Sequence, residues 1–559
     1  MARMVLPSAR EVSRYWILLK LMVPLPDKTR VLLPFRDAMA SGSKPFRVGV
    51  VFDGARTLRW VESLITFLKE LPGIEVCRLT FGGPRLEEAR PPWLVDRLYS
   101  ISRQKFDPLS EVDRKNGAAG GDRTETLDSI RALGCGVVIW LSSGGETMNF
   151  AGLAKHGVLT VQFGQRQGPL PFWDEVATNQ PTSTATVYWH DSSLNRGRVV
   201  RKVETSTVQG LYFTMNAGEP FAAIIQTLAG LCYEIKQEGP ASEERFRRVE
   251  EEPMCRAGSA PYPSALQAGQ FIASKLSLSV VLRWQSRGGD PKWFVAVRPN
   301  SGRSIVDPDP NGLNGFREIP LPQGSDYLAD PFLIEVDGRT WLFVEEVPLS
   351  VSRGRLSCME LFENGSCSGM TVVMEQNYHL SYPCLIPANG ELFLLPESGA
   401  ALQINLYRFT RFPAETELVA TLLEGLVAVD TTPIFLNDRW YFFTTTVQPF
   451  METLLFSSNR LDGVWTLHPS NPVSTSVKNS RSAGHLFWEN GRLFRPTQDC
   501  SIRYGYAITL NEITRLTPTE FEEHPVGHVP PKWMPGLLGT HTWNQSSAFQ
   551  VIDGLRFSS

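Results

Sequence analysis

Acidic residues recur at related places in the C-terminal half of the sequence, and their pattern suits sugar chemistry. Asp330 and Asp430 each precede a strand-like run, and Glu397 follows one. Two carboxyl groups in one site can act as the acid and the base of glycosidic-bond chemistry, and carboxylates also bind sugar hydroxyls. Asp330, Asp430 and Glu397 are therefore the predicted catalytic residues. The alternative is that these side chains only cap turns, as aspartate often does.

Further polar residues occupy corresponding places and are predicted to bind the substrate. They are Asp326, Glu345, Glu346, Tyr382, Arg481, His485, Arg495, Gln498, Asp499, Tyr504 and His541. Arg481, Arg495 and His485 would balance the carboxylates or hold an anionic group such as a phosphate. No metal and no cofactor is predicted, because the eight cysteines contain no CxxC pair.

The elements that must position these residues are repeated hairpins. Residues 326–346 read as two short strands joined by a turn at Asp337-Gly338. Similar hairpins follow at 379–397, 427–443 and 481–496, and a degenerate copy ends at 557. Their starts recur about every 50 residues, which is typical of a β-propeller with one four-stranded sheet per repeat. Residues 269–559 are therefore predicted to form five blades, with strands at 280–284 and 292–298 beginning the ring and one of them completing its last blade.

Two families resemble this region. Asp330-Pro331 is similar to the first blade of the five-bladed arabinanases, invertases and levansucrases, which implies that Asp330 is a base or nucleophile and that Asp430 steadies the transition state. Asp430 stands two residues earlier than expected, and the fourth-blade acid is missing from 481–485. Residues 325–555 are more similar to the propeller-like region of glucosamine inositolphosphorylceramide transferases. That resemblance rests on the motif Arg-Pro-Thr-Gln-Asp-Cys-Ser at 495–501, followed by Tyr504-Gly505. It implies a glycan context.

The N-terminal half alternates strand and helix patterns, which predicts a Rossmann-type parallel sheet over 46–238. The predicted strands are 47–53, 74–81, 136–141 and 157–163, and the predicted helices are 59–71, 124–133, 146–155 and 219–237. Residues 157–200 resemble a formyltransferase core. The catalytic Asn, His and Asp of that family match Thr160, Gln162 and Asn195, none of which can replace a His or a carboxylate. Formyl transfer is therefore not expected.

Composition limits the partners. A charged share of 20% and a net charge of −3 offer no basic stripe for nucleic acid. No run approaches the roughly 20 apolar residues of a membrane span, although 15–23 could contact a membrane surface. Scattered cysteines in apolar surroundings favour a cytoplasmic location. Residues 1–45 are expected to be an extension, and the polar, proline-rich 239–268 a linker between the two domains.

These observations predict a carbohydrate-active protein of cell-surface glycan or glycolipid assembly, whose partner is a sugar, a nucleotide sugar or a glycolipid. Glycosyl transfer or other glycosidic-bond chemistry would take place in the propeller. The alternatives are a non-catalytic module that binds a glycan or nucleotide sugar, and a hydrolase of the five-bladed glycosidase type. The missing fourth-blade acid favours binding or an unusual transfer, whereas the many carboxylates favour chemistry.

Overall fold

The computed structural model describes most of the chain from residue 45 to residue 557. The described residues are 45–53, 57–81, 91–103, 111–112, 124–142, 148–164, 170–192, 197–249, 251, 262–285, 290–302, 304–306, 313–448 and 450–557. They fall into two compact units, which meet in the sequence between Val281 and Leu282. The expected extension at 1–45 and the segment 15–23 lie outside the described residues, apart from residue 45.

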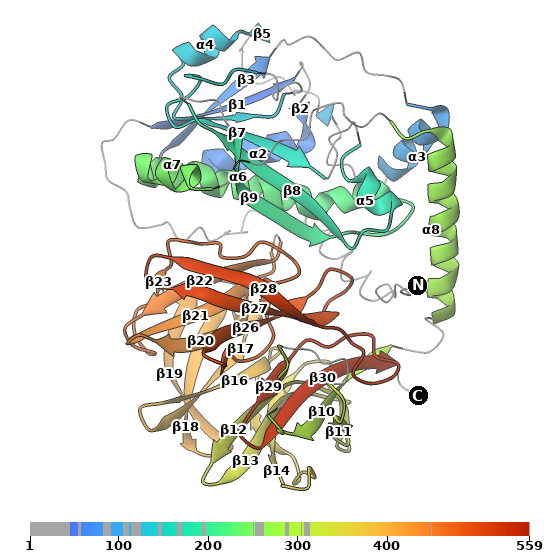
Figure 1. Cartoon of the computed structure of the whole chain (residues 1–559), viewed down its shortest axis with the longest axis vertical. Helices are drawn as coiled ribbons and strands as arrows, with labels where there is room; N and C mark the ends of the chain where they lie inside the picture. Colours follow the sequence, from blue (N-terminus) through green and yellow to red (C-terminus); the bar gives the residue numbers. More distant parts are fainter. Residues whose placement is uncertain are drawn as a thin grey trace. The chain divides into compact units, whose positions relative to one another are not determined.

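The N-terminal unit contains one seven-stranded sheet in the order β5-β3-β1-β6-β7-β8-β9 (Figure 1). Its strands are β1 (Phe46–Asp53), β3 (Ile74–Phe81), β5 (Thr124–Glu125), β6 (Val137–Trp140), β7 (Val158–Phe163), β8 (Thr182–His190) and β9 (Gly197–Ser206). The first five strands in this order run parallel. β8 and β9 are antiparallel, so the sheet is mixed where an all-parallel sheet was predicted. The resemblance to a formyltransferase domain stays a prediction.

Helices of this unit follow most of the predicted positions. They are α2 (Arg59–Glu70), α3 (Trp93–Arg103), α4 (Leu127–Ala132), α5 (Trp173–Ala177), the 3-10 helix η2 (Phe213–Ala217) and α6 (Gly218–Glu238), and β2 (Thr57–Leu58) pairs with β4 (Glu111–Val112). The helix predicted at 146–155 is wrong, because its described part forms turns and bends. Gly152 has φ +68° there, a conformation that a helix does not contain.

Two helices lie partly within the expected linker. α7 (Pro240–Arg247) begins at its start and α8 (Ala265–Gln285) begins near its end. Phe246 of α7 is buried, with its ring 5.5 Å from that of Trp189 in β8, so α7 packs on the sheet. The strand predicted at 280–284 is wrong, because those residues belong to α8. A short apolar run does not by itself separate a strand from a helix.

The C-terminal unit is a five-bladed β-propeller (Figure 1). Blade 1 contains β12 (Ser325–Val336), β13 (Arg339–Pro348), β14 (Arg355–Leu361) and β15 (Thr371–Met374). Blade 2 contains β16 (Ser381–Ala388), β17 (Glu391–Glu397), β18 (Gln403–Arg411) and β19 (Glu415–Glu424), with the 3-10 helix η4 (Gly399–Ala401) between β17 and β18. Blade 3 contains β20 (Ala428–Leu436), β21 (Arg439–Thr446), β22 (Glu452–Ser458) and β23 (Thr466–Leu467). Blade 4 contains β24 (Arg481–Ser482), β25 (Phe487–Glu489), β26 (Arg492–Asp499), β27 (Ala507–Leu516) and β28 (Phe521–Val529).

Blade 5 closes the ring by joining the two ends of this unit. It pairs β10 (Pro291–Pro299) and β11 (Arg317–Glu318) with β29 (Trp543–Gln545) and β30 (Phe549–Phe557). β10 and β30 are antiparallel over their whole length, and both lie against β12 of blade 1. The prediction that an early strand completes the last blade is therefore confirmed for 292–298.

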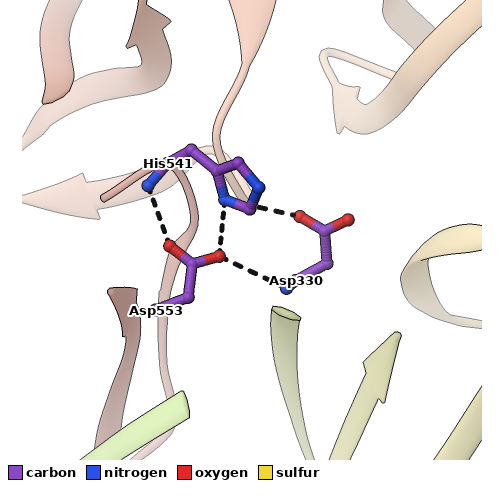
Figure 2. Close-up of side chains that lie close together, drawn as sticks. All are labelled: Asp330, His541 and Asp553. Atoms are coloured by element: carbon purple, nitrogen blue, oxygen red, sulfur yellow. Dashed lines mark hydrogen bonds and ion pairs between the residues drawn. The ribbon is translucent and has the colours of Figure 1, made fainter. Parts of the chain in front are cut away.

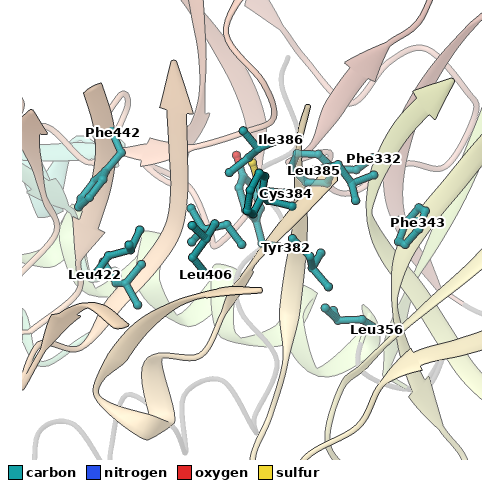
Figure 3. Packing of buried hydrophobic residues seen from close by; sticks show 14 of the residues in the cluster. Phe332, Phe343, Leu356, Tyr382, Cys384, Leu385, Ile386, Leu406, Leu422 and Phe442 are labelled. Atoms are coloured by element: carbon teal, nitrogen blue, oxygen red, sulfur yellow. The ribbon is translucent and has the colours of Figure 1, made fainter. Parts of the chain in front are cut away.

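Apolar side chains of successive blades pack against one another between the sheets. One such cluster joins blades 1, 2 and 3 through fully buried residues such as Phe332, Leu394 and Phe442, and Figure 3 shows part of it. Burial of a side chain of this size stabilises the fold by about 1.5–3 kcal/mol. No single hairpin can cover its own apolar face, so the ring supplies the partner that each blade needs.

Candidate functional site

The inner strands of three blades share a backbone irregularity, and acidic residues occupy two of its copies. Strand pairing skips two residues between Ala329 and Phe332, between Ser381 and Cys384, and between Val429 and Thr432. The first residue skipped in each case is Asp330, Tyr382 or Asp430, with φ of 48°, 47° and 49°. A left-handed conformation costs a residue with a side chain about 1–2 kcal/mol. Strain kept at matching places in a ring indicates a functional site.

This irregularity corrects the alignment of the repeats. Asp430 stands two residues earlier than expected only if Pro433 is aligned with Pro331. The strand pairing makes Asp430 the counterpart of Asp330 itself. Glu345 and Glu397 occupy equivalent positions in blades 1 and 2. Glu345 lies opposite Ala329 and Glu397 lies opposite Ser381, the residues directly before the irregularity in each blade.

Gly484 continues the pattern in blade 4, with φ +125°. A Cβ atom added there would overlap the carbonyl oxygen of Trp543 in blade 5. We expect Gly484→Ala to lower the free energy of unfolding by more than about 1 kcal/mol, because both the left-handed backbone and the close approach exclude a side chain. Thermal melting of the full chain tests this. Gly369→Ala is the control, because no atom lies within 4 Å of its added Cβ; equal melting temperatures for the two variants would contradict the argument.

Asp330, His541 and Asp553 form a buried cluster between blades 1 and 5 (Figure 2). His541 Nδ1 lies 2.5 Å from Asp553 Oδ2 and 3.8 Å from Asp330 Oδ1. Asp553 also accepts hydrogen bonds from the backbone N–H groups of His541 and Thr542, and Thr542 donates its hydroxyl to Asp330. Tyr382 of blade 2 donates its N–H to the other Asp330 oxygen.

The charges in this cluster are set by burial and by one another. Burial alone would lower the pKa of His541, but the carboxylates of Asp553 and Asp330 outweigh it and raise that pKa to about 9. Burial raises the pKa of Asp330 to about 6. The possible ligand atoms of the three residues lie within 4.8 Å of one another, close enough to surround a metal ion. The 2.5 Å between His541 Nδ1 and Asp553 Oδ2 is too short for a metal ion to lie between these two atoms, so the arrangement fits an ion pair better.

A second cluster lies on the side of blades 2, 3 and 4. Arg481 forms ion pairs with Asp430 and, at 3.4 Å, with Glu397. Gln498 donates to Asp430 at 3.0 Å, and the Arg481 guanidinium lies 4.8 Å from the centre of the Tyr504 ring. Burial and then the negative charge of Asp430 raise the pKa of Glu397 well above its usual value. Tyr504 also contacts the ring of His541, which joins the two clusters.

Glu345 of blade 1 belongs to the same site. Its pKa is raised to about 8 by burial and then by the negative charge of Asp330, with a smaller contribution from Asp430. The eight residues that meet here are called the axial site below, because they come from all five blades. They are Asp330, Glu345, Glu397, Asp430, Arg481, Gln498, Tyr504 and His541.

The other predicted site residues do not join this set. The hydroxyl of Tyr382 bonds Thr432 and the backbone of Gly484, and so ties blades 2, 3 and 4 together. His485 packs on Phe332, and burial lowers the pKa of His485 to about 4. Apart from the backbone N–H of Tyr382, which donates to Asp330, neither residue is found to bond an axial-site side chain in the described structure.

Four further predicted residues lie within single blades or between adjacent ones. Asp326 pairs with Lys292, Glu346 with Arg355, Arg495 with Glu523, and Asp499 with His528. Successive side chains of a strand point to opposite faces. Glu346 therefore faces away from the axial site because Glu345 faces it, and the same alternation separates Asp499 from Gln498.

Of the two roles predicted for Arg481 and Arg495, these contacts fit the balancing of carboxylates and not the binding of an anionic group. Arg481 already faces two carboxyl groups, and Arg495 is paired with Glu523 of β28. His485 is buried and its pKa is low, so it adds no positive charge near neutral pH. Among the described axial residues, acidic side chains outnumber basic ones.

The matched formyltransferase positions make internal contacts. Thr160 lies 2.9 Å from His190 Nε2, and Gln162 accepts a hydrogen bond from Tyr188. Asn195 lies outside the described residues. Burial lowers the pKa of His190 to about 4, so this histidine is neutral near pH 7.

Several residues of the site were missed in the sequence. Asp553 and Thr542 complete the buried cluster, Trp293 stacks on His541 with ring centres 3.9 Å apart, and His379 lies 3.3 Å from Glu345. His541 and Thr542 stand in one short polar run, 540–542, whose buried hydroxyl and imidazole groups are a signal for such a cluster. Asp553 could not be recognised as a site residue, because the dipeptide Asp553-Gly554 is a common turn signal.

The fold and the axial site define a five-bladed β-propeller with an acidic centre shared by all its blades. The propeller region resembles one family in particular: the profile described as glucosamine inositolphosphorylceramide transferase 1, N-terminal, matches residues 319–553. The transferase of that name from Oryza sativa subsp. japonica is 30% identical over 255 residues, which are 44% of this chain and 32% of the rice protein. The one from Arabidopsis thaliana is 28% identical over 238 residues, 41% of this chain and 30% of that protein. The chain thus matches about a third of the length of these relatives.

The solved structures that resemble this chain are more distant. Zg3597, a family 117 glycoside hydrolase from Zobellia galactanivorans, is 12% identical with a TM-score of 0.31, covering 47% of this chain and 91% of that chain. The exo-β-1,3-galactanase 1,3Gal43A from Clostridium thermocellum is 11% identical with a TM-score of 0.32, covering 42% and 60%. These scores carry no argument about the site. In the described part of the chain, no helix has both the length and the apolar character needed to cross a membrane.

Proposed function

We propose that the propeller is a carbohydrate-active unit that takes a sugar of a glycan or glycolipid at the axial site and acts on its glycosidic bond. The observation that carries this proposal is the matched placement of Asp330 and Asp430 at equivalent strained positions of two blades. Both side chains lie beside glutamates whose pKa values are raised. Glycosidic chemistry needs such an environment, in which one carboxyl group is ionised and another keeps its proton.

Each predicted catalytic residue has a role that its contacts allow. Asp330, with a pKa of about 6, is mostly ionised at neutral pH and can take a proton from the attacking hydroxyl. Asp430, held by Arg481 and Gln498, offers a fixed negative charge to an oxocarbenium-like transition state. Glu397 shares the Arg481 guanidinium with Asp430 and keeps that pair in place.

The charges of the axial site favour an uncharged sugar. The cations Arg481 and His541 already face Asp330, Asp430 and Asp553, so no positive charge is left over for a phosphate. Sugar hydroxyls can donate to these carboxylates, and the rings of Tyr504 and Trp293 border the same place. The plant relatives carry a name that joins a sugar, glucosamine, to a lipid, which agrees with a glycan or glycolipid substrate.

A binding module is the second candidate. Arg481 contacts both Asp430 and Glu397 and could hold them permanently as hydrogen-bond acceptors for a glycan. The N-terminal unit would then serve as a formyltransferase-like domain without formyl transfer, binding a nucleotide sugar or a partner protein.

Asp430→Asn in the full chain separates the two candidates. We expect this variant to keep glycan binding within about tenfold and to lose turnover by about 100-fold or more, because the amide keeps the shape but not the charge. A glycan array measures binding, and a panel of aryl glycosides, with water or a free sugar as acceptor, measures turnover. Asp438→Asn is the control, since Asp438 is an exposed turn residue of the same blade that is also left-handed. If the natural protein binds glycans but turns over no glycoside, the propeller is a binding module. If it neither binds glycans nor turns over a glycoside, the proposed sugar site is refuted.

A further inference from the structure

The acid that the fourth blade lacks has a candidate in blade 1. Glu345 lies on β13, opposite Ala329, next to the strained Asp330. Only 8% of its side chain is exposed. One of its oxygens, Oε1, is held from two sides: the Tyr327 hydroxyl lies at 3.4 Å and His379 Nε2 at 3.3 Å.

The hydrogen bonds of His379 fix which of its nitrogens faces Glu345 as a donor. The backbone N–H of Gly354 donates to His379 Nδ1 at 2.9 Å, so Nδ1 must be the acceptor nitrogen. The ring hydrogen of a neutral His379 is then on Nε2, the nitrogen that lies 3.3 Å from Glu345 Oε1. Its side chain is 42% exposed, so this histidine connects the buried carboxyl group with the surface.

Gly354 shows that this arrangement is built into the backbone. A Cβ atom at Gly354 would come within 2.8 Å of Glu345 Oε1 and 2.9 Å of the His379 ring. Any other residue would push the carboxyl group and the imidazole apart. The glycine therefore permits the approach that the contact requires.

The second oxygen of Glu345 is the one that can react. Oε1 accepts the Tyr327 hydrogen bond and lies next to the donor nitrogen of His379, so the proton of a neutral Glu345 is on Oε2, for which no hydrogen bond is found within the described propeller. The negative charge of Asp330 and the burial of Glu345 both favour retention of this proton. Glu397 has a raised pKa as well, but its carboxyl group lies 3.4 Å from the Arg481 guanidinium, which also binds Asp430, so Glu397 is already engaged by a neighbouring side chain.

We propose that Glu345 is the proton donor to the leaving group of the sugar substrate and that His379 is its positioning residue. This inference rests on the proposed function. As the glycosidic C–O bond breaks, the Glu345 proton passes to the leaving oxygen, and the new carboxylate keeps the hydrogen bond of Tyr327 and the nearby N–H group of His379. The attacking water or sugar hydroxyl forms the new C–O bond and gives its proton to Asp330. That proton returns through solvent to Glu345, which completes the cycle.

Leaving groups of different acidity test this assignment. The probes are the phenyl and the 2,4-dinitrophenyl glycosides of whichever sugar the full-length protein turns over in the aryl-glycoside panel. A dinitrophenolate leaves without a proton, whereas a phenolate needs one. We expect Glu345→Gln to lower kcat/KM for the phenyl glycoside about 100- to 10,000-fold and for the dinitrophenyl glycoside less than about tenfold. Asp330→Asn should lower both.

Other outcomes overturn the inference separately from the proposed function. If the natural protein is active and Glu345→Gln lowers both substrates equally or neither, Glu345 is not the acid. If Glu397→Gln shows the leaving-group selectivity instead, the acid is Glu397. If the natural protein turns over no glycoside in the panel, the proposed chemistry itself fails, and this assignment fails with it. Thermal melting confirms that each variant is folded.

The role of His379 has a readout that a structural defect would not produce. His379→Ala should steepen the dependence of kcat/KM on leaving-group acidity, because the carboxylate left after proton transfer loses a donor. His379→Gln places an amide N–H near the position of Nε2 and should restore most of the shallow dependence. An equal loss for all leaving groups in both variants would contradict a positioning role.

Discussion

Asp330→Asn is expected to reduce turnover of the glycosidic substrate about 100- to 10,000-fold while leaving the propeller folded, because it removes the proposed general base and keeps the shape of the side chain. Asparagine adopts the left-handed conformation readily, so the φ of 48° at this position is kept. Its side-chain oxygen can still accept the Thr542 hydroxyl. The loss of the second acceptor, used by the Tyr382 N–H, costs about 1 kcal/mol of stability. Steady-state kinetics and thermal melting measure the two effects together.

The matched control is Asp337→Asn. Asp337 is exposed, lies in the hairpin turn of the same blade and is also left-handed, with φ 51°. Asn and Asp are equally suited to that turn, so the control should change neither activity nor stability by a measurable amount. Full activity of Asp330→Asn would remove the base from the proposed mechanism and make Asp330 a structural residue of the axial site.

The architecture of the propeller could be predicted because its signal is repeated. Each hairpin combines strands of alternating apolar residues with a local turn, such as Asp337-Gly338 or Asn389-Gly390. Both residues of each of these two turns have positive φ. A period near 50 residues then determines the number of blades. The N-terminal sheet has no such repeat, and its antiparallel edge of β8 and β9 could not be inferred from strand and helix patterns alone.

The composition of the site could be predicted only in part. Asp330, Asp430, Glu345, Glu397 and Arg481 were found because they flank the hairpins. The irregular pairing at Asp330 and Asp430 could not be predicted from the sequence, since it depends on which residues of the inner strand stay unpaired with the neighbouring strand. For the same reason, neighbouring polar residues could not be assigned to the inner or outer face.

Asp553 shows how tertiary packing overrides a local turn signal. Asp553-Gly554 has the composition of a hairpin turn, yet both residues lie inside β30. Gly554 is needed because a Cβ there would come within 2.7 Å of the Phe294 ring on β10. Only glycine fits at this position beside the neighbouring strand. The buried Asp553 that precedes it forms an ion pair with His541.

Asp553→Asn is expected to have the largest effect on stability of any substitution in the propeller discussed above. The carboxylate is fully buried and accepts hydrogen bonds from Asp330, His541 and Thr542, whose donors an amide cannot all satisfy. Removing it also leaves the His541 imidazolium without its principal partner. Breaking a buried pair in this way costs about 3–5 kcal/mol. Hydrogen exchange of propeller peptides in the full chain measures this loss without interference from the N-terminal unit.

The pH dependence of stability distinguishes the ion pair from general packing. The pKa of His541 rises from 6.5 to about 9 on folding, so its stabilising contribution is complete below pH 6.5 and is lost as pH rises through 9. The size of this loss is on the order of 3 kcal/mol, at 1.36 kcal/mol per unit. Asp553→Asn should remove much of it, so the two proteins should differ most at pH 6 and least at pH 10. Asp462→Asn, which alters an exposed pair with Arg460, should change stability by less than about 1 kcal/mol at any pH. A difference between natural protein and Asp553→Asn that stays constant from pH 6 to 10 would show that Asp553 acts through its hydrogen bonds to the backbone and that His541 is neutral.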